Sequence, residues 1–170
     1  AYRTGTFFAF EPSEIKPDIV PIAKGIGGGF PLGACLVTEK VSVGMTAGTH
    51  GSTFGGNPLA MAVGNAVLDI LFEKNFFKNV QEKGKYFYQK LNNVKEKYPK
   101  IIQEIRGVGL MLGLKVCLDN TKFMMKLMDH KMLTVKAEEN TVRLFPPLIV
   151  SNNELDEAIN KIENTCEDLS

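Results

Sequence analysis

The sequence predicts an α/β protein in two parts, residues 1–73 and residues 74–170. Twelve of the 16 glycines fall in residues 1–64, whereas 14 of the 17 lysines fall after residue 72. Short apolar runs of strand length occur in both parts, and longer segments with helical spacing of apolar residues separate them. We therefore expect a glycine-rich first part, followed by a second part in which helices cover one side of a small sheet.

The overall composition argues against several classes of function. Apolar residues make up 44 % of the 170-residue chain, which is enough for a core. With 20 basic and 19 acidic residues the net charge is +1, which argues against charge-driven binding to nucleic acid or to a membrane surface. No apolar run approaches the roughly 20 residues that are needed to span a bilayer.

The cysteines indicate the redox compartment of the protein, and the first residues indicate whether the chain is a fragment. Cys35, Cys117 and Cys166 are too few and too far apart for a disulfide framework or a metal site, so we expect buried free thiols in a reducing cytoplasm. Two distant histidines give no zinc spacing, and no metal is predicted. The chain opens without a start methionine or a signal-peptide pattern, directly before an apolar segment, so we expect a fragment of a longer protein.

The first part is organised around Lys24. A mostly apolar run, residues 18–23, ends in this lysine, four glycines follow within five positions, and a second apolar run covers residues 34–37. The pattern predicts a strand, a loop and a strand, with an amine at the exit of the first strand. Between buried strands the amine should be partly desolvated, which makes it a better nucleophile for a Schiff base with a carbonyl cofactor.

Lys24 has two other interpretations. A lysine beside a glycine-rich loop is as often a solvated loop residue, and the residues of this stretch alone leave that interpretation open. A phosphate-binding Walker loop places its lysine after the glycines and follows it with Ser or Thr. Here the lysine comes first, so the Walker loop is rejected.

A second glycine-rich loop, residues 49–58, precedes a predicted helix over residues 59–72. Asn57 and Pro58 have the pattern of an N-cap followed by proline at the first helical position. The helix is apolar nearly all round, which predicts deep burial. The hydroxyls of Ser52 and Thr53 ahead of a helix start are suitable anion ligands, although such a loop is more often a plain capping turn. A phosphorylated aldehyde cofactor would need both these hydroxyls and the lysine.

The second part alternates helices and strands. An amphipathic helix is predicted over residues 75–98, and Ser151 with Glu154 forms a capping box that opens a last helix. The remaining expected elements are strands at 101–105 and 110–116 around a turn at 106–109, a helix at 120–130, and strands at 133–136 and 141–145.

Arg143 stands out in the second part. It is one of three arginines, and it lies in a segment with strand character. Its guanidinium can bind a carboxylate through two parallel hydrogen bonds. The alternative, an edge-strand arginine that pairs with a surface acid, is the more frequent case without further context.

Five motifs together resemble those of class-III pyridoxal-phosphate aminotransferases. They are AKGIGGGFPLGA at 23–34, THGSTFGGNPLA at 49–60, VRLFPPL at 142–148, RTG at 3–5 and RGVGLM at 106–111. The resemblance covers the whole chain and implies the C-terminal portion of a fold type I (aspartate aminotransferase-like) enzyme. Residues 1–73 would end the large cofactor domain, and residues 74–170 would form the small C-terminal α/β domain.

The resemblance implies a role for each candidate residue. Lys24 would bind pyridoxal 5′-phosphate and move the substrate proton. Thr53, together with Ser52, would contact the cofactor phosphate, from the neighbouring subunit of a homodimer with active sites at its interface. Arg143 would bind the carboxylate of glutamate or 2-oxoglutarate. The acid that pairs with the pyridine nitrogen, the phosphate turn and the ring-stacking residue lie upstream in the family, so the 170 residues alone should bind cofactor poorly and be inactive.

Within that family the amino donor is expected to be N2-acetyl-L-ornithine, with 2-oxoglutarate as acceptor, in arginine biosynthesis. Ornithine, succinylornithine, succinyl-diaminopimelate and 4-aminobutyrate are alternative donors. A different class of function, a non-catalytic α/β module that assembles with a partner, also stays open.

Overall fold

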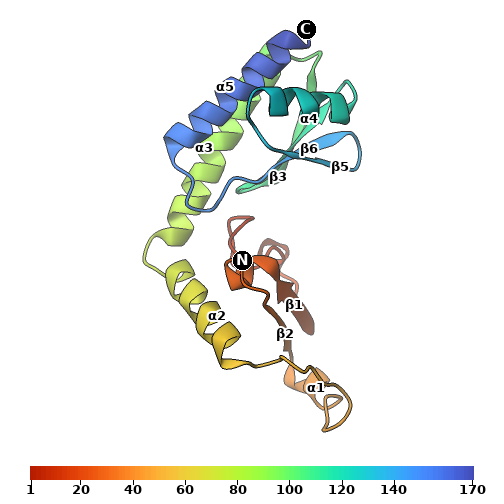
Figure 1. Cartoon of the computed structure of the whole chain (residues 1–170), viewed down its shortest axis with the longest axis vertical. Coiled ribbons are helices and arrows are strands. Elements are labelled where there is room, and N and C mark those ends of the chain that lie inside the picture. The colour runs from red at the N-terminus through yellow and green to blue at the C-terminus, as the bar shows by residue number, and fades with distance from the viewer. The chain divides into compact units, whose positions relative to one another are not determined.

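The computed structural model describes residues 1–170 as two compact units of mixed α/β structure (Figure 1). The first unit comprises Ala1 with residues 10–76, and the second comprises residues 2–9 with residues 77–170. The second unit thus includes a short N-terminal segment, Tyr2–Ala9, in addition to the C-terminal half of the chain. No helix is both long and apolar enough to cross a bilayer.

The first unit contains the predicted strand, loop and strand. Strand β1 pairs with β2 in an antiparallel two-stranded sheet, in which Ile19 faces Val37 and Ala23 faces Gly33. The elements of this unit are η1 (Glu11–Ser13), β1 (Ile19–Ala23), η2 (Lys24–Gly27), β2 (Gly33–Val37), α1 (Glu39–Ser42) and α2 (Pro58–Leu71).

Helix α2 begins as predicted. The Asn57 side chain accepts a hydrogen bond of 2.9 Å from the Ala60 amide, and Pro58 occupies the first helical position. The prediction of deep burial is wrong, because Leu59 is 62 % exposed and Ile70 is 51 % exposed. Within the first unit α2 packs against η2 and the loop that follows it, and much of the rest of its surface stays exposed.

The second unit holds a four-stranded antiparallel sheet in the order β3-β4-β6-β5. Each strand and helix predicted for this part is present, with ends that differ by a few residues. The first turn is shorter than predicted, because β3 and β4 extend until Val108 pairs with Met111, which leaves only Gly109 and Leu110 in the turn. The elements are α3 (Phe76–Lys97), β3 (Ile102–Val108), β4 (Met111–Val116), α4 (Asn120–Asp129), β5 (Val135–Ala137), β6 (Thr141–Leu144) and α5 (Asn152–Asp168).

One face of this sheet forms the core of the second unit. Residues opposite one another in neighbouring strands share a face, and Ile105, Leu114 and Val142 form one such buried row. Helices α3 and α5 lie side by side against the sheet (Figure 1) and are joined by a 2.6 Å hydrogen bond from the Tyr86 hydroxyl to Asp156. The opposite face of the sheet carries the next row, which contains Arg143.

The cysteine prediction is confirmed in part. No disulfide forms, and Cys166 is buried in α5. Cys35 and Cys117 are exposed, against expectation, because Cys35 lies on the uncovered strand β2 and Cys117 follows the end of β4.

Candidate active-site residues

Lys24 stands at the exit of β1, as predicted, and begins η2. Its backbone takes a φ of 57°, directly after the extended Ala23 with a φ of −155°. A left-handed conformation is costly for a residue with a side chain, and such strain is often retained at functional sites. No sequence pattern indicated this left-handed conformation.

The predicted desolvation of Lys24 is not observed, because the residue is exposed. Every residue of β2 is exposed as well, and β1 is at most half-buried. The prediction assumed buried strands on both sides, whereas nothing in this chain covers the two-stranded sheet well enough to bury its strands.

Helix α2 holds the loop that follows Lys24. Gly28 has a φ of 56°, and a Cβ there would lie only 2.8 Å from a methyl group of Val67 on α2. Ile26 is buried, and the Phe30 amide donates a 2.8 Å hydrogen bond to the Gly27 carbonyl. The loop therefore has a defined path, and the glycine at position 28 lets it pass close to the helix.

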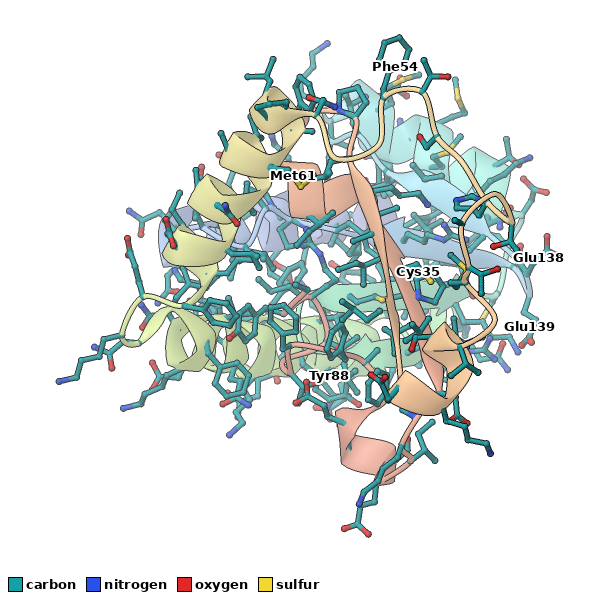
Figure 2. The ribbon with its side chains drawn as sticks, turned by 90° about the horizontal axis from the view of Figure 1, so that it is seen from below. Cys35, Phe54, Met61, Tyr88, Glu138 and Glu139 are labelled. Atoms are coloured by element: carbon teal, nitrogen blue, oxygen red, sulfur yellow. The ribbon has the colours of Figure 1, made fainter.

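Ser52 and Thr53 lie in the exposed loop before α2. The first free amides of the helix are largely taken, since Pro58 has no N–H and the Ala60 amide bonds to Asn57. An anion bound at this loop would therefore depend on the Ser52 and Thr53 hydroxyls more than on the helix start. Figure 2 shows the Phe54 ring standing out from the same loop, where it is 80 % exposed.

Arg143 lies on β6, an inner strand between β4 and β5. The alternative of an edge-strand arginine paired with a surface acid is therefore wrong, and no ion pair joins Arg143 to an acidic side chain of the described chain. Arg143 and Phe145 help to line a shallow hollow of about 300 Å³ on the open face of the sheet, a volume at the lower end for small-molecule sites.

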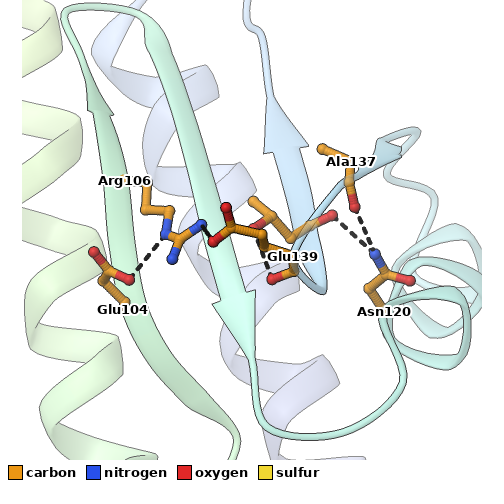
Figure 3. A network of polar contacts seen from close by, with 6 residues as sticks. Glu104, Arg106, Asn120, Ala137 and Glu139 are labelled. Atoms are coloured by element: carbon orange, nitrogen blue, oxygen red, sulfur yellow. Dashed lines mark hydrogen bonds and ion pairs between the residues drawn. The ribbon is translucent and has the colours of Figure 1, made fainter.

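Further charged residues share this face, among them Glu104, Arg106 and Glu139, which the sequence analysis did not identify. Arg106 donates through Nε to Glu104 at 2.8 Å and through Nη1 to Glu139 at 2.6 Å (Figure 3). The Arg106 guanidinium holds the pKa of the Glu139 carboxyl below its ordinary value. Residues 106–109 were predicted to be a turn, which concealed the alternation of Glu104 and Arg106 on one face of a strand.

The N-terminal segment braces the end of the sheet. Arg3 donates hydrogen bonds to the carbonyls of Leu110 and Pro146, and its own carbonyl accepts from the Leu110 amide at 3.0 Å. Partial burial lowers the pKa of the Arg3 guanidinium. The segment just after β6, which follows Arg143, is therefore tied to the turn between β3 and β4.

The first unit offers a primary amine at the end of a strand and two loop hydroxyls, and the second unit offers a guanidinium with no acidic partner in this chain. Groups of these types bind aldehydes, phosphates and carboxylates in proteins. The model of the family "Aminotransferase class-III" matches residues 1–166, and the chain belongs to this family. Class-III aminotransferases depend on pyridoxal phosphate.

Individual members of the family are similar to this chain over almost its whole length. Acetylornithine aminotransferase from Mesorhizobium japonicum is 56 % identical over 160 residues, which cover 94 % of this chain and 40 % of the relative. The crystal structure of acetylornithine aminotransferase from Elizabethkingia anophelis matches with a TM-score of 0.89 at 29 % identity, over 98 % of this chain and 43 % of that one. Ornithine aminotransferase from Toxoplasma gondii ME49 matches with a TM-score of 0.90 at 32 % identity, over 99 % and 41 %.

The chain thus spans about two fifths of the length of these relatives, and it matches their C-terminal portion. The predicted family and fold class are confirmed.

Proposed function

We propose that this chain is the C-terminal part of a pyridoxal-phosphate-dependent aminotransferase that moves the terminal amine of N2-acetyl-L-ornithine to 2-oxoglutarate, in arginine biosynthesis. The similarity to acetylornithine aminotransferases over nearly the whole chain supports the substrate. The single observation that carries the chemistry is the exposed amine of Lys24, set in a left-handed conformation ahead of a glycine-rich loop.

The residues around Lys24 fit pyridoxal phosphate. A primary amine at the end of β1 is the group that joins an aldehyde. At Gly25 and Gly29 a Cβ would meet no atom within 4 Å apart from those of the adjoining backbone, so a flat ring can approach the chain there. The hydroxyls of Ser52 and Thr53 are exposed and fit a phosphate.

When bound, the cofactor supplies the electron withdrawal that acidifies the substrate carbon. Lys24 would hold the cofactor through Nζ, and its amine would take up and return the proton of the substrate carbon. Thr53, with Ser52, would hold the phosphate end. Arg143 binds the carboxylate of the substrate with its guanidinium fork and so fixes which substrate bond faces the reacting centre.

Assembly belongs to the proposal as well. Residues 1–73 would end the large cofactor domain and residues 74–170 would form the small domain, in a cytoplasmic homodimer with active sites at the subunit interface. The open strands around Lys24 and the exposed side chains of α2 favour such cover by further polypeptide. For the same reason the 170 residues alone should neither hold the cofactor firmly nor transaminate.

The test uses the longer protein that contains this sequence. Borohydride reduction of the cofactor-loaded protein followed by peptide mapping should place a pyridoxyl group on Lys24, and Lys24→Ala should abolish both the yellow colour and amino-group transfer. An adduct on another lysine, or a Lys24→Ala protein that stays yellow and active, would contradict the proposal. Lys40→Ala, a change at another lysine of the first unit, serves as the matched control.

A second candidate keeps the chemistry and changes the donor. The match to Toxoplasma gondii ornithine aminotransferase favours free ornithine among the alternatives, ahead of succinylornithine, succinyl-diaminopimelate and 4-aminobutyrate. Rates with a panel of these donors decide between them. A protein without any adduct on Lys24 would instead support the non-catalytic assembly module.

A further inference from the structure

Two arginines face the same side of the sheet on one row of the strand register. Arg106 on β3 lies opposite Gly113 on β4, and Gly113 lies opposite Arg143 on β6. Gly113 puts no side chain between the two guanidinium groups, and a Cβ there would meet Thr141 Cγ2 at 2.7 Å. All four residues line the hollow described above.

Only one of the two arginines forms ion pairs with acidic side chains of this chain. Arg106 is held by two carboxylates, Glu104 on its own strand and Glu139 on the turn between β5 and β6. Its positive charge is therefore more than compensated within the protein. Within this chain Arg143 has no acidic partner, and of the two arginines its guanidinium is the one left to meet a ligand's carboxylate.

Glu139 would be the natural competitor for Arg143. It lines the same hollow, its side chain is 68 % exposed, and only Arg106 pairs with it. Two charges of opposite sign that share one hollow attract each other strongly enough to compete with a ligand. Without Arg106, Glu139 and Glu104 would lose their ion pairs, and the single charge of Lys115, opposite Glu104 on β4, would offset only part of the negative charge beside Arg143.

The turn that carries Glu139 has a separate anchor. Asn140 donates to the carbonyls of Val116 and Leu118 at 2.7 and 2.6 Å. Asn120 donates to those of Ala137 and Thr141 at 3.1 Å each, and Figure 3 shows its bond to Ala137. Loss of the Arg106 pair therefore changes the charge in the hollow and leaves the path of the turn in place.

We propose that Arg106 is a positioning residue that keeps Arg143 free for the substrate carboxylate, by holding Glu104 and Glu139 in ion pairs of its own. The inference rests on the proposed function of Arg143 and extends it: the hollow over Gly113 takes a single carboxylate group, such as one end of a dicarboxylate.

The experiment measures the affinity of the cofactor-loaded longer protein for glutarate, an unreactive dicarboxylate, by titration calorimetry at low salt and neutral pH. The KM and kcat for 2-oxoglutarate are measured beside it. The variants are Arg106→Gln, Glu139→Gln, the double variant with both changes, and Arg143→Gln. Lys97→Gln breaks an exposed pair between α3 and α5 away from the hollow and is the matched control.

Arg106→Gln is expected to weaken glutarate binding about tenfold and to raise KM with little change in kcat, because two free carboxylates then compete for Arg143. The double variant should recover most of that loss, and Glu139→Gln alone should bind glutarate at least as tightly as the wild type. High salt should shrink all of these differences, since the pairs are exposed.

Three results would separate the possible failures. If Arg143→Gln binds glutarate as the wild type does, the proposed function of Arg143 is wrong. If Arg143→Gln loses binding while Arg106→Gln keeps it, only the positioning role of Arg106 is overturned. If Arg106→Gln weakens binding and the double variant is no better, Arg106 contacts the carboxylate itself and the inference is again wrong. Should Arg106→Gln fail to fold, Glu139→Gln alone tests whether Glu139 competes for Arg143, and weaker glutarate binding by this variant would contradict the inference.

Discussion

Replacing Gly84 by alanine should destabilise the second unit, although alanine is the better helix former. Gly84 lies inside α3, and a Cβ there would stand 2.8 Å from Gly109 Cα and C and 2.9 Å from its carbonyl oxygen. These are backbone atoms, which cannot rotate away. The turn at Gly109 cannot retreat either, because a Cβ at Gly109 would itself meet the Thr4 carbonyl carbon at 2.7 Å.

The net effect follows from two opposing contributions. Alanine in a helix interior gains about 1 kcal/mol over glycine. Forcing a methyl group into a filled space costs about 1–3 kcal/mol, and contact with three backbone atoms places this site at the upper end. We expect a net loss of about 1–2 kcal/mol in the free energy of unfolding, which lowers the urea midpoint by roughly 1 M.

Tyrosine fluorescence is a suitable probe. The chain has no tryptophan, and all four tyrosines belong to the second unit. Gly64→Ala in α2 is the control, since its Cβ would meet only the end of the flexible Leu32 side chain, and it lies in the first unit. An unchanged or higher urea midpoint for Gly84→Ala would show that α3 and the β3–β4 turn are not in close contact.

Three further predictions concern α5. Thr165→Val should raise the free energy of unfolding by about 1 kcal/mol in urea titrations, because the fully buried Thr165 hydroxyl has no hydrogen-bond partner. Ser151→Ala should cost about 1 kcal/mol at pH 7. That cost should shrink as the pH falls below 4.5, because the Ser151 amide and hydroxyl lower the pKa of Glu154, and a carboxylate with a lowered pKa loses its stabilising contribution on protonation. At pH 8 a thiol-specific reagent should label Cys35 and Cys117 in the folded protein, and Cys166 only after denaturation. Burial keeps the reagent from Cys166 and raises the pKa of its thiol to about 12.

Local chemistry explains why much of the fold could be predicted. Asn57 before Pro58 fixes the start of α2, and the capping box of Ser151 and Glu154 fixes the start of α5, because each motif satisfies backbone amides within a few residues. The buried face of α3 likewise follows from its helical spacing of apolar residues. Each of these patterns depends only on residues that are close together in the sequence.

Features that depend on pairing between distant segments were missed. Arg106 was placed in a turn, because the two glycines at 107 and 109 indicated one, whereas the register of β3 with β4 extends both strands past Gly107. The packing of Tyr2–Ala9 with the second unit had no sequence signal, since it depends on the close approach of the Arg3 backbone to Gly109. The roles proposed for Lys24, Thr53, Ser52 and Arg143 stay predictions.

The structure around Lys24 is far less buried than the structure around Arg143. In the first unit only Ile26, Ala60 and Leu71 are buried apolar residues, and every residue of β2 beside the Lys24 loop is exposed. The second unit holds all the other buried apolar side chains, including fully buried Phe87 on α3. Because burial of apolar surface is the main source of stability, the sheet that carries Arg143 has the core it needs within this chain, whereas the strands that flank Lys24 do not. The carboxylate recognition proposed for Arg143 would therefore be supported by structure within this chain, while the desolvation that would activate the Lys24 amine would have to come from polypeptide that covers β1 and β2.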